Sequence, residues 1–179
     1  MPVTGRPEPA PGLLRRLDAT ARGAAPGVST ALLMIGSTAP VGLPSLLPAI
    51  GLACVFFWSV FRPAAMPAPA VFGLGLMQDL LGFAPLGVGV LTLLLVHGSA
   101  LKLRRFLAKR SFVVVWLAHC GFALGAVALG YVLQALLNWQ MPPRVPALVQ
   151  LGFCAGLYPP LAWFLTRAHR GMQRAEDLA

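Results

Sequence analysis

Long uncharged stretches, separated by arginine and lysine, set the pattern of the chain. Residues 23–61 contain no Asp, Glu, Lys or Arg, and residues 63–101 contain only Asp79. Each stretch would measure about 58 Å as a helix, whereas the hydrocarbon core of a bilayer is about 30 Å thick. Each is therefore predicted to cross a membrane twice, with breaks at the proline- and glycine-rich segments 40–44 and 82–87.

Two further apolar stretches complete the pattern. One runs from 112 to 138, and the other from 145 to 166, where Pro159 and Pro160 either kink or divide the helix. The predicted fold class is therefore all-α, a polytopic integral membrane protein with six transmembrane helices. The predicted spans are residues 26–39, 45–61, 66–81, 86–102, 112–138 and 145–166.

The basic residues test this topology independently. The chain carries 14 Lys and Arg against 5 Asp and Glu, a net charge of +9. With the N-terminus cytoplasmic, 13 of the 14 basic residues fall in inner segments and only Arg144 falls outside, as the positive-inside rule requires. Because 58% of the residues are hydrophobic and 11% are charged, we attribute the charge to topology and lipid headgroups, and we expect no nucleic-acid partner.

Five basic residues form an inner-face basic cluster between the fourth and fifth spans: Lys102, Arg104, Arg105, Lys109 and Arg110. Apolar side chains are interleaved with them, a pattern typical of an amphipathic turn at the membrane interface. The cluster serves either topology and lipid contact, or the docking of an acidic cytoplasmic surface.

The spans divide the chain into three parts. A basic cytoplasmic N-terminal tail (1–25) precedes the six-helix transmembrane domain (26–167), and a cytoplasmic C-terminal tail (168–179) follows it. The predicted connections are short on both sides of the membrane. Any function is therefore expected within the bilayer.

Asp79 is the only acidic residue between Asp18 and Glu176. An ionisable side chain within a span costs about 2.5–3.5 kcal/mol on insertion scales, which marks it for a role. One possible role is functional, including partner binding. The other is structural, as a cap of the turn at Gly82 to Pro85 near the outer end of the third span.

Small residues recur at helix-packing spacing in the last two spans. Gly121 and Gly125 form one pair, and Gly152 and Gly156 form another. Such pairs let helix backbones approach closely in lipid. We expect them to pack the fifth and sixth spans against each other.

The residues that carry common chemistries do not group in the sequence. It contains no Walker loop, HExxH motif or GxSxG motif. The cysteines (Cys54, Cys120 and Cys154) form no CxxC pair, and His97 and His119 are expected to pack in spans. We expect no enzymatic activity, no catalytic residue, no metal and no cofactor.

One stretch of the sequence is a more specific indication of a protein family than the features above. The pattern W-x-x-x-R-P, followed by G-L-x-x-D-L-L-x-x-x-P-L-G, resembles the rod shape-determining protein MreD family. The residues that carry the motif are Trp58, Arg62, Pro63, Gly75, Gln78, Asp79, Pro85 and Gly87. Trp58 and Arg62, four positions apart, lie on one helix face and would place an aromatic anchor and a cation at the inner interface.

The resemblance implies a non-enzymatic scaffold subunit of the bacterial elongation machinery, which maintains cell shape and peptidoglycan insertion. Members of the family associate with the bitopic membrane protein MreC. Through it they link MreB filaments to the RodA glycosyltransferase and a penicillin-binding transpeptidase. The implied location is the bacterial cytoplasmic (inner) membrane.

For this function we expect partner helices to bind groove-like faces lined by Gly73, Gly75, Gln78 and Asp79. The alternative function is the substrate-binding membrane subunit of an energy-coupling-factor type vitamin transporter, since the family's six-helix arrangement is similar to such subunits. Its ligand would lie between helices near the outer face. The oligomeric state and the helices that contact partners stay open.

Overall fold

The computed structural model describes residues 13–38 and 45–177, with side chains within 23–38 and 45–167. The described residues form six α-helices and one short 3-10 helix, and no strand occurs among them. The prediction of an all-α chain with six helices is confirmed. The elements are α1 (Leu13–Ser37), α2 (Leu46–Phe61), η1 (Pro63–Ala65), α3 (Ala68–Leu81), α4 (Val88–Leu107), α5 (Phe112–Asn138) and α6 (Arg144–Asp177).

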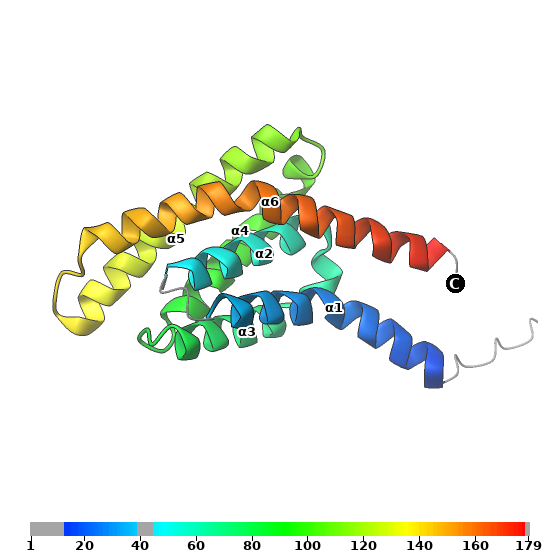
Figure 1. The fold of residues 1–179 in the computed structure, drawn as a ribbon, viewed down its shortest axis with the longest axis horizontal. Coiled ribbons are helices and arrows are strands. Elements are labelled where there is room, and N and C mark those ends of the chain that lie inside the picture. Colours follow the sequence, from blue (N-terminus) through cyan, green and yellow to red (C-terminus); the bar gives the residue numbers. More distant parts are fainter. Residues whose placement is uncertain (1–12, 39–44, 178–179) are drawn as a thin grey trace, which may run out of the picture.

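The helices pack as three layers of two (Figure 1). α2 and α4 form the middle layer, α1 and α3 cover one side of it, and α5 and α6 cover the other. Successive helices run in opposite directions, so α2, α4 and α6 begin where α1, α3 and α5 end. We call this the junction end. The opposite end, where α4 finishes with basic residues, we call the basic end.

α2 is the centre of the bundle. Thirteen of its 16 residues are buried, on every side of the helix. Its sequence is apolar almost throughout, which suits a helix surrounded by other helices rather than one with a polar face. The hydrophobic core is therefore built around α2, with Phe56 and Trp58 among its largest fully buried side chains.

The outside of the bundle is also apolar. Large hydrophobic side chains are exposed on the five helices that surround α2, including Leu32, Phe72, Leu95, Leu117 and Leu148. Soluble monomers rarely expose contiguous apolar surface on this scale. Such an exterior is what a lipid-facing surface requires.

Two helices are long and apolar enough to cross a membrane: α5, and α6 from Arg144 to Arg167. α2 and α3 have 16 and 14 residues, which corresponds to about 24 and 21 Å. Both are shorter than the hydrocarbon core of about 30 Å. The helix count matches the sequence prediction, whereas the crossing of the bilayer by all six helices stays a prediction.

α1 is longer than the predicted first span. It begins at Leu13, so the predicted boundary between tail and transmembrane domain falls inside the helix, next to Pro26. The hydroxyls of Ser29 and Thr30 donate to the Pro26 carbonyl at 3.0 and 2.7 Å. The predicted break at 40–44 lies outside the described residues.

α6 runs without interruption through Pro159 and Pro160, so the prolines do not divide the last helix. A proline at 159 has no N–H to donate to the Ala155 carbonyl. The indole N–H of Trp116 on α5 donates to that carbonyl instead, at 3.0 Å. A side chain of the neighbouring helix thus supplies the hydrogen bond that the proline removes.

The predicted turn at 102–110 is only partly a turn. α4 continues to Leu107, so three of the five cluster residues lie on its last turns and only Lys109 and Arg110 follow it. Cations are favourable near a helix C-terminus because the helix dipole is negative there. The guanidinium of Arg110 lies over the Phe106 ring, 4.3 Å from its centroid.

Candidate functional site

The candidate site lies at the junction end, where α3 passes into α4. It is built on a close approach of the two helices at Gly75. A Cβ atom at this position would lie 2.5 Å from Val90 Cα and 2.9 Å from Val90 N. Only glycine fits without a backbone shift, so Gly75 fixes the distance between α3 and α4.

Asp79 lies one turn further along α3 and is almost completely buried, with 1% of its surface exposed. Its carboxylate accepts hydrogen bonds from the backbone N–H groups of Gly87 at 2.8 Å and Gly89 at 2.7 Å, and a longer one from Val90 at 3.5 Å. Its own carbonyl accepts from Ala84 N–H at 3.1 Å.

These bonds explain how the fold tolerates a buried carboxylate. The first N–H groups of a helix have no partner within the helix, and the helix dipole favours a negative charge beside them. Asp79 therefore caps α4 from the preceding helix with charge-assisted hydrogen bonds. Of the two roles left open by the sequence, the contacts give the structural one, and the capped groups belong to α4 rather than to the turn at Gly82 to Pro85.

The turn between the helices is shaped by the end of the motif. Val88 N–H donates to the Pro85 carbonyl at 3.3 Å. Gly87 precedes α4 with φ of +100°, a backbone conformation that favours glycine. Glycine at both ends of the motif is thus explained, at Gly75 by the close approach and at Gly87 by the backbone conformation.

Gln78 occupies the space between α2, α3 and α4. A Cβ atom at Gly51 on α2 would lie 2.7 Å from its Oε1, and one at Gly89 would lie 2.9 Å from its Nε2. Glycine at 51 and 89 therefore leaves room for the amide. Its buried Oε1 has no hydrogen-bond partner.

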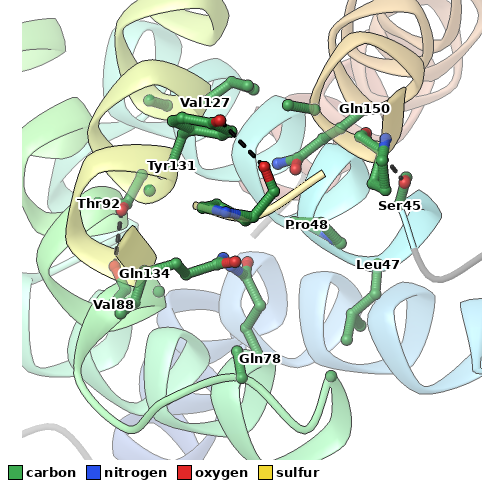
Figure 2. A pocket seen from close by; sticks show the side chains of 18 of the residues that line it. Ser45, Leu47, Pro48, Gln78, Val88, Thr92, Val127, Tyr131, Gln134 and Gln150 are labelled. Atoms are coloured by element: carbon green, nitrogen blue, oxygen red, sulfur yellow. Dashed lines mark hydrogen bonds between the residues drawn. The ribbon is translucent and has the colours of Figure 1, made fainter. Parts of the chain in front are cut away.

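The Gln78 amide faces a cavity of about 290 Å³ between the junction ends of α2 to α6. Figure 2 shows Gln78 and Gln134 pointing toward each other across it, with Gln150 entering from α6. The hydroxyl of Tyr131 donates to the Pro142 carbonyl at 3.0 Å. Under the predicted topology, this cavity lies near the outer face.

No family model, no curated protein and no solved structure matches the chain. The resemblance to the MreD family therefore rests on the motif residues of the sequence alone.

The structure brings only part of the motif together. Gly75, Gln78, Asp79, Pro85 and Gly87 form the junction just described, whereas the other three motif residues lie at the far end of α2. There Arg62 N–H donates to the Trp58 carbonyl at 2.8 Å, and Pro63 opens η1 directly after α2 ends.

The prediction that Trp58 anchors the inner interface is wrong. Its side chain is fully buried, because α2 is enclosed by its neighbours instead of facing lipid. Arg62 is half-buried at the end of the helix. The basic cluster is exposed as expected, except Arg104, which is half-buried.

The four residues predicted to line one partner-binding groove do not lie on one face of the bundle. Gly75, Gln78 and Asp79 face the inside of the bundle, where a partner helix cannot reach them. A Cβ atom at Gly73 would meet nothing within 4 Å, and Gly73 lines a separate groove of about 580 Å³ between α1 and α3. Asp79 caps α4, and its part in partner binding stays a prediction.

The two histidines join helices. The Ser59 hydroxyl donates to the Val55 carbonyl at 2.6 Å, so His97 Nδ1 must donate to Ser59 Oγ at 2.7 Å. His119 Nε2 donates to the Cys154 carbonyl at 3.2 Å, and its ring stacks on Tyr158. The predicted packing role is consistent with both environments.

The small-residue pairs do not pack α5 against α6. None of Gly121, Gly125, Gly152 and Gly156 has an atom within 4 Å of the position where a Cβ would stand. The α5–α6 contact is made by larger groups, including His119 and Tyr158. Gly121 and Gly125 instead line an apolar groove of about 550 Å³ between α4 and α5.

Sequence reasoning missed the glutamines of the cavity, Gln134 and Gln150. The available signal was a polar amide within an otherwise apolar helix, the same argument that marks Asp79. No such signal shows that residues 78, 134 and 150 converge, because they lie on three helices far apart in the sequence.

Proposed function

We propose that the protein is a non-enzymatic scaffold of the bacterial cytoplasmic membrane that belongs to the cell-wall elongation machinery and resembles MreD. It would bind an MreC-like bitopic protein and help couple MreB filaments to RodA and a penicillin-binding transpeptidase. The observation that carries the proposal is the α3–α4 junction. Four motif residues lie together there and are joined by hydrogen bonds or close packing: Gly75, Asp79, Pro85 and Gly87. The motif that carries the resemblance therefore corresponds to a defined structural feature.

The surface of the bundle supports a role in the membrane. Apolar side chains cover the outer helices, and the basic cluster lies at one end. Under the positive-inside rule the basic end faces the cytoplasm. Helices shorter than the bilayer can be accommodated by local thinning at modest cost.

The groove between α4 and α5 suits a single partner helix. Its walls carry small side chains, Ser99, Ala118, Gly121 and Gly125, on an apolar background. Small residues allow close backbone approach between helices in lipid, where apolar area alone gives little driving force. We place an MreC-like transmembrane helix in this groove.

Leucine at both Gly121 and Gly125 would fill the groove without a clash inside the chain, since both positions are open. Co-purification of the MreC-like partner from membranes should fall by about tenfold, equivalent to about 1.4 kcal/mol. The matched control is leucine at both Gly152 and Gly156, which have the same spacing and are also open. Equal partner recovery from both double variants would contradict this placement.

The function itself is tested by controlled depletion in the native bacterium. We expect cells to become wider and rounder, with new peptidoglycan inserted at dispersed sites instead of along the cylinder. Re-expression of the chain should restore both. Normal width and normal insertion after complete depletion would overturn the scaffold function.

A second candidate is the substrate-binding subunit of a vitamin transporter. The specific observation in its favour is the cavity at the junction end, which is concave, partly polar and formed between helices. Depletion would then leave the shape normal and create a nutritional requirement. The same experiment therefore separates the two functions.

A further inference from the structure

The cavity at the junction end has a composition that the scaffold function does not use. Three glutamines reach it from three helices, Gln78 from α3, Gln134 from α5 and Gln150 from α6 (Figure 2). All three are half-buried. Within the part of the chain that the structure describes, none of their amide groups makes a hydrogen bond, and Gln78 Oε1 is a buried acceptor without a donor.

The other polar groups in the wall are already engaged. The Tyr131 hydroxyl donates to the Pro142 carbonyl, and the Thr92 hydroxyl donates to the Val88 carbonyl at 2.6 Å. The Asp79 carboxylate accepts from the backbone of α4. Among the lining side chains, the donors that are still free therefore belong to the three amides, whereas the hydroxyl oxygens can still accept.

This arrangement selects against charge. The lining residues include no Lys or Arg to hold an anion. The single carboxylate is already matched by the positive end of α4, which weakens its attraction for a cation. An amide offers one carbonyl acceptor and two N–H donors, so the cavity suits a neutral ligand that donates and accepts at several points.

The volume of the cavity further restricts the chemical class of the ligand. A volume of about 290 Å³ lies at the lower limit of the roughly 300–1,000 Å³ usual for small-molecule sites. A single amide of a ligand could satisfy one glutamine, but three amides that converge from three sides require several hydroxyls on one small body. A sugar or polyol meets this requirement.

We propose that the cavity binds a small, uncharged, hydroxyl-rich group of the sugar or polyol class through Gln78, Gln134 and Gln150. The group comes either from a free solute or from the headgroup of a lipid, since both present the same chemistry. This site does not depend on the scaffold function. Under the transporter function it would narrow the transported ligand to this class.

The test uses the full chain in nanodiscs of phosphatidylcholine, because sugar-based detergents would occupy the site. Methyl β-glucoside is titrated by calorimetry, with glucosamine and glucuronate as charged counterparts of similar size. A second set of nanodiscs contains monoglucosyl diacylglycerol, and its effect on the thermal unfolding temperature is recorded. A ligand that binds the folded state alone raises this temperature.

We expect the neutral glucoside or the glucolipid to bind, with each charged sugar at least tenfold weaker. Gln134→Leu should weaken binding by about tenfold, the size of one good hydrogen bond. Gln140→Leu is the matched control, because Gln140 is exposed outside the cavity and should leave affinity unchanged.

The titration with free glucoside and the glucolipid nanodiscs together identify the source of the bound group. Binding of the free glucoside indicates a solute, whereas an effect of the glucolipid alone indicates a headgroup. No binding in either arm would overturn the proposal, as would equal affinity for the charged sugars. Unchanged affinity in Gln134→Leu, with an unchanged unfolding temperature, would also overturn it. Cell-shape defects on depletion are independent of all these outcomes.

Discussion

The two ends of the bundle differ in the burial of the charged residues that stand out in the sequence: Asp79 at the junction end and the basic cluster at the other. At the junction end the carboxylate of Asp79 is buried against the start of α4, and three glutamines reach the cavity. Gln140 and Arg144, at the connection between α5 and α6, are exposed. At the basic end most of the cluster is exposed, with Lys109 and Arg110 beyond the last turn of α4. Asp79 is thus part of the packed interior at one end, whereas most of the basic cluster lies on the surface at the other.

The comparison shows what the number of charged residues in an apolar stretch predicts about their burial. A single acidic residue among many apolar ones predicts a buried, fully bonded group, because a lone charge in a low-dielectric interior is costly. A run of like charges cannot be buried together and predicts an exposed face. Substitutions at the two ends should therefore differ in kind as well as in size.

The largest expected contrast concerns the sides of the membrane. A membrane-impermeant maleimide added to spheroplasts should label Gln140→Cys, in the connection at the junction end, but not Lys109→Cys at the basic end. The wild-type chain is the control for its native cysteines, of which Cys54 and Cys154 are buried. Labelling of both variants, or of Lys109→Cys alone, would break the predicted topology.

Asp79→Ala should cause the largest loss of stability. It leaves the N–H groups of Gly87 and Gly89 without their acceptor, which costs about 4 kcal/mol of unfolding free energy. Unfolding can be followed in detergent by a thiol-reactive dye, since Cys54 and Cys154 are buried in the fold. Asp79→Asn, which keeps one carbonyl acceptor, should lose roughly half as much. A wild-type unfolding curve for Asp79→Ala would refute the capping role.

Gly75→Ala should cause the second-largest loss of stability. Its methyl group would meet the backbone of Val90, and overpacking of this kind costs about 2 kcal/mol. The matched control is Gly73→Ala on the same helix, where the added methyl meets nothing within 4 Å. The control should be neutral or slightly stabilising, because alanine favours the helix. Equal losses in both variants would remove the argument for close approach.

Substitutions at the basic end should change the stability least. Arg105 and Lys109 are exposed, so replacement of both by glutamine should change the unfolding free energy by about 0.5 kcal/mol or less. The expected effect is instead weaker association with anionic vesicles, measured by co-flotation. A stability loss as large as that of Asp79→Ala would erase the contrast between the two ends.

Much of the fold could be predicted from the sequence. The lengths of the uncharged stretches and the proline- and glycine-rich breaks predict six helices, and the α5 limits agree at both ends. The end of α4 is not predicted, because Lys102, Arg104 and Arg105 suggest a turn where the helix continues. Charged residues do not stop a helix, and cations at its C-terminus stabilise it.

The position of each helix within the bundle could not be predicted. α2 and α5 are both apolar around their whole circumference, yet α2 is central and α5 buries only Val115, His119, Ala123 and Ala126. Hydropathy does not distinguish protein from lipid as the neighbour. The same ambiguity explains why Trp58 is wrongly predicted at an interface and Gly121 against α6.

The residues of the α3–α4 junction could be predicted from the sequence, whereas their geometry and two of the cavity glutamines could not. Asp79 stands out as a charge in a span, and the motif spacing marks Gly75 and Gly87. That the carboxylate caps α4 follows only from the path of the turn. The convergence of Gln134 and Gln150 on Gln78 depends on tertiary packing, which no local pattern records.

The bond from Trp116 to the carbonyl opposite Pro159 bears on how the chain is made. A backbone carbonyl without a partner is costly in lipid, so α6 is poorly suited to enter a bilayer alone. α5 is synthesised first and already carries the indole that satisfies this carbonyl. If both helices cross a bilayer, entry of α5 and α6 as a pair would keep this carbonyl bonded throughout.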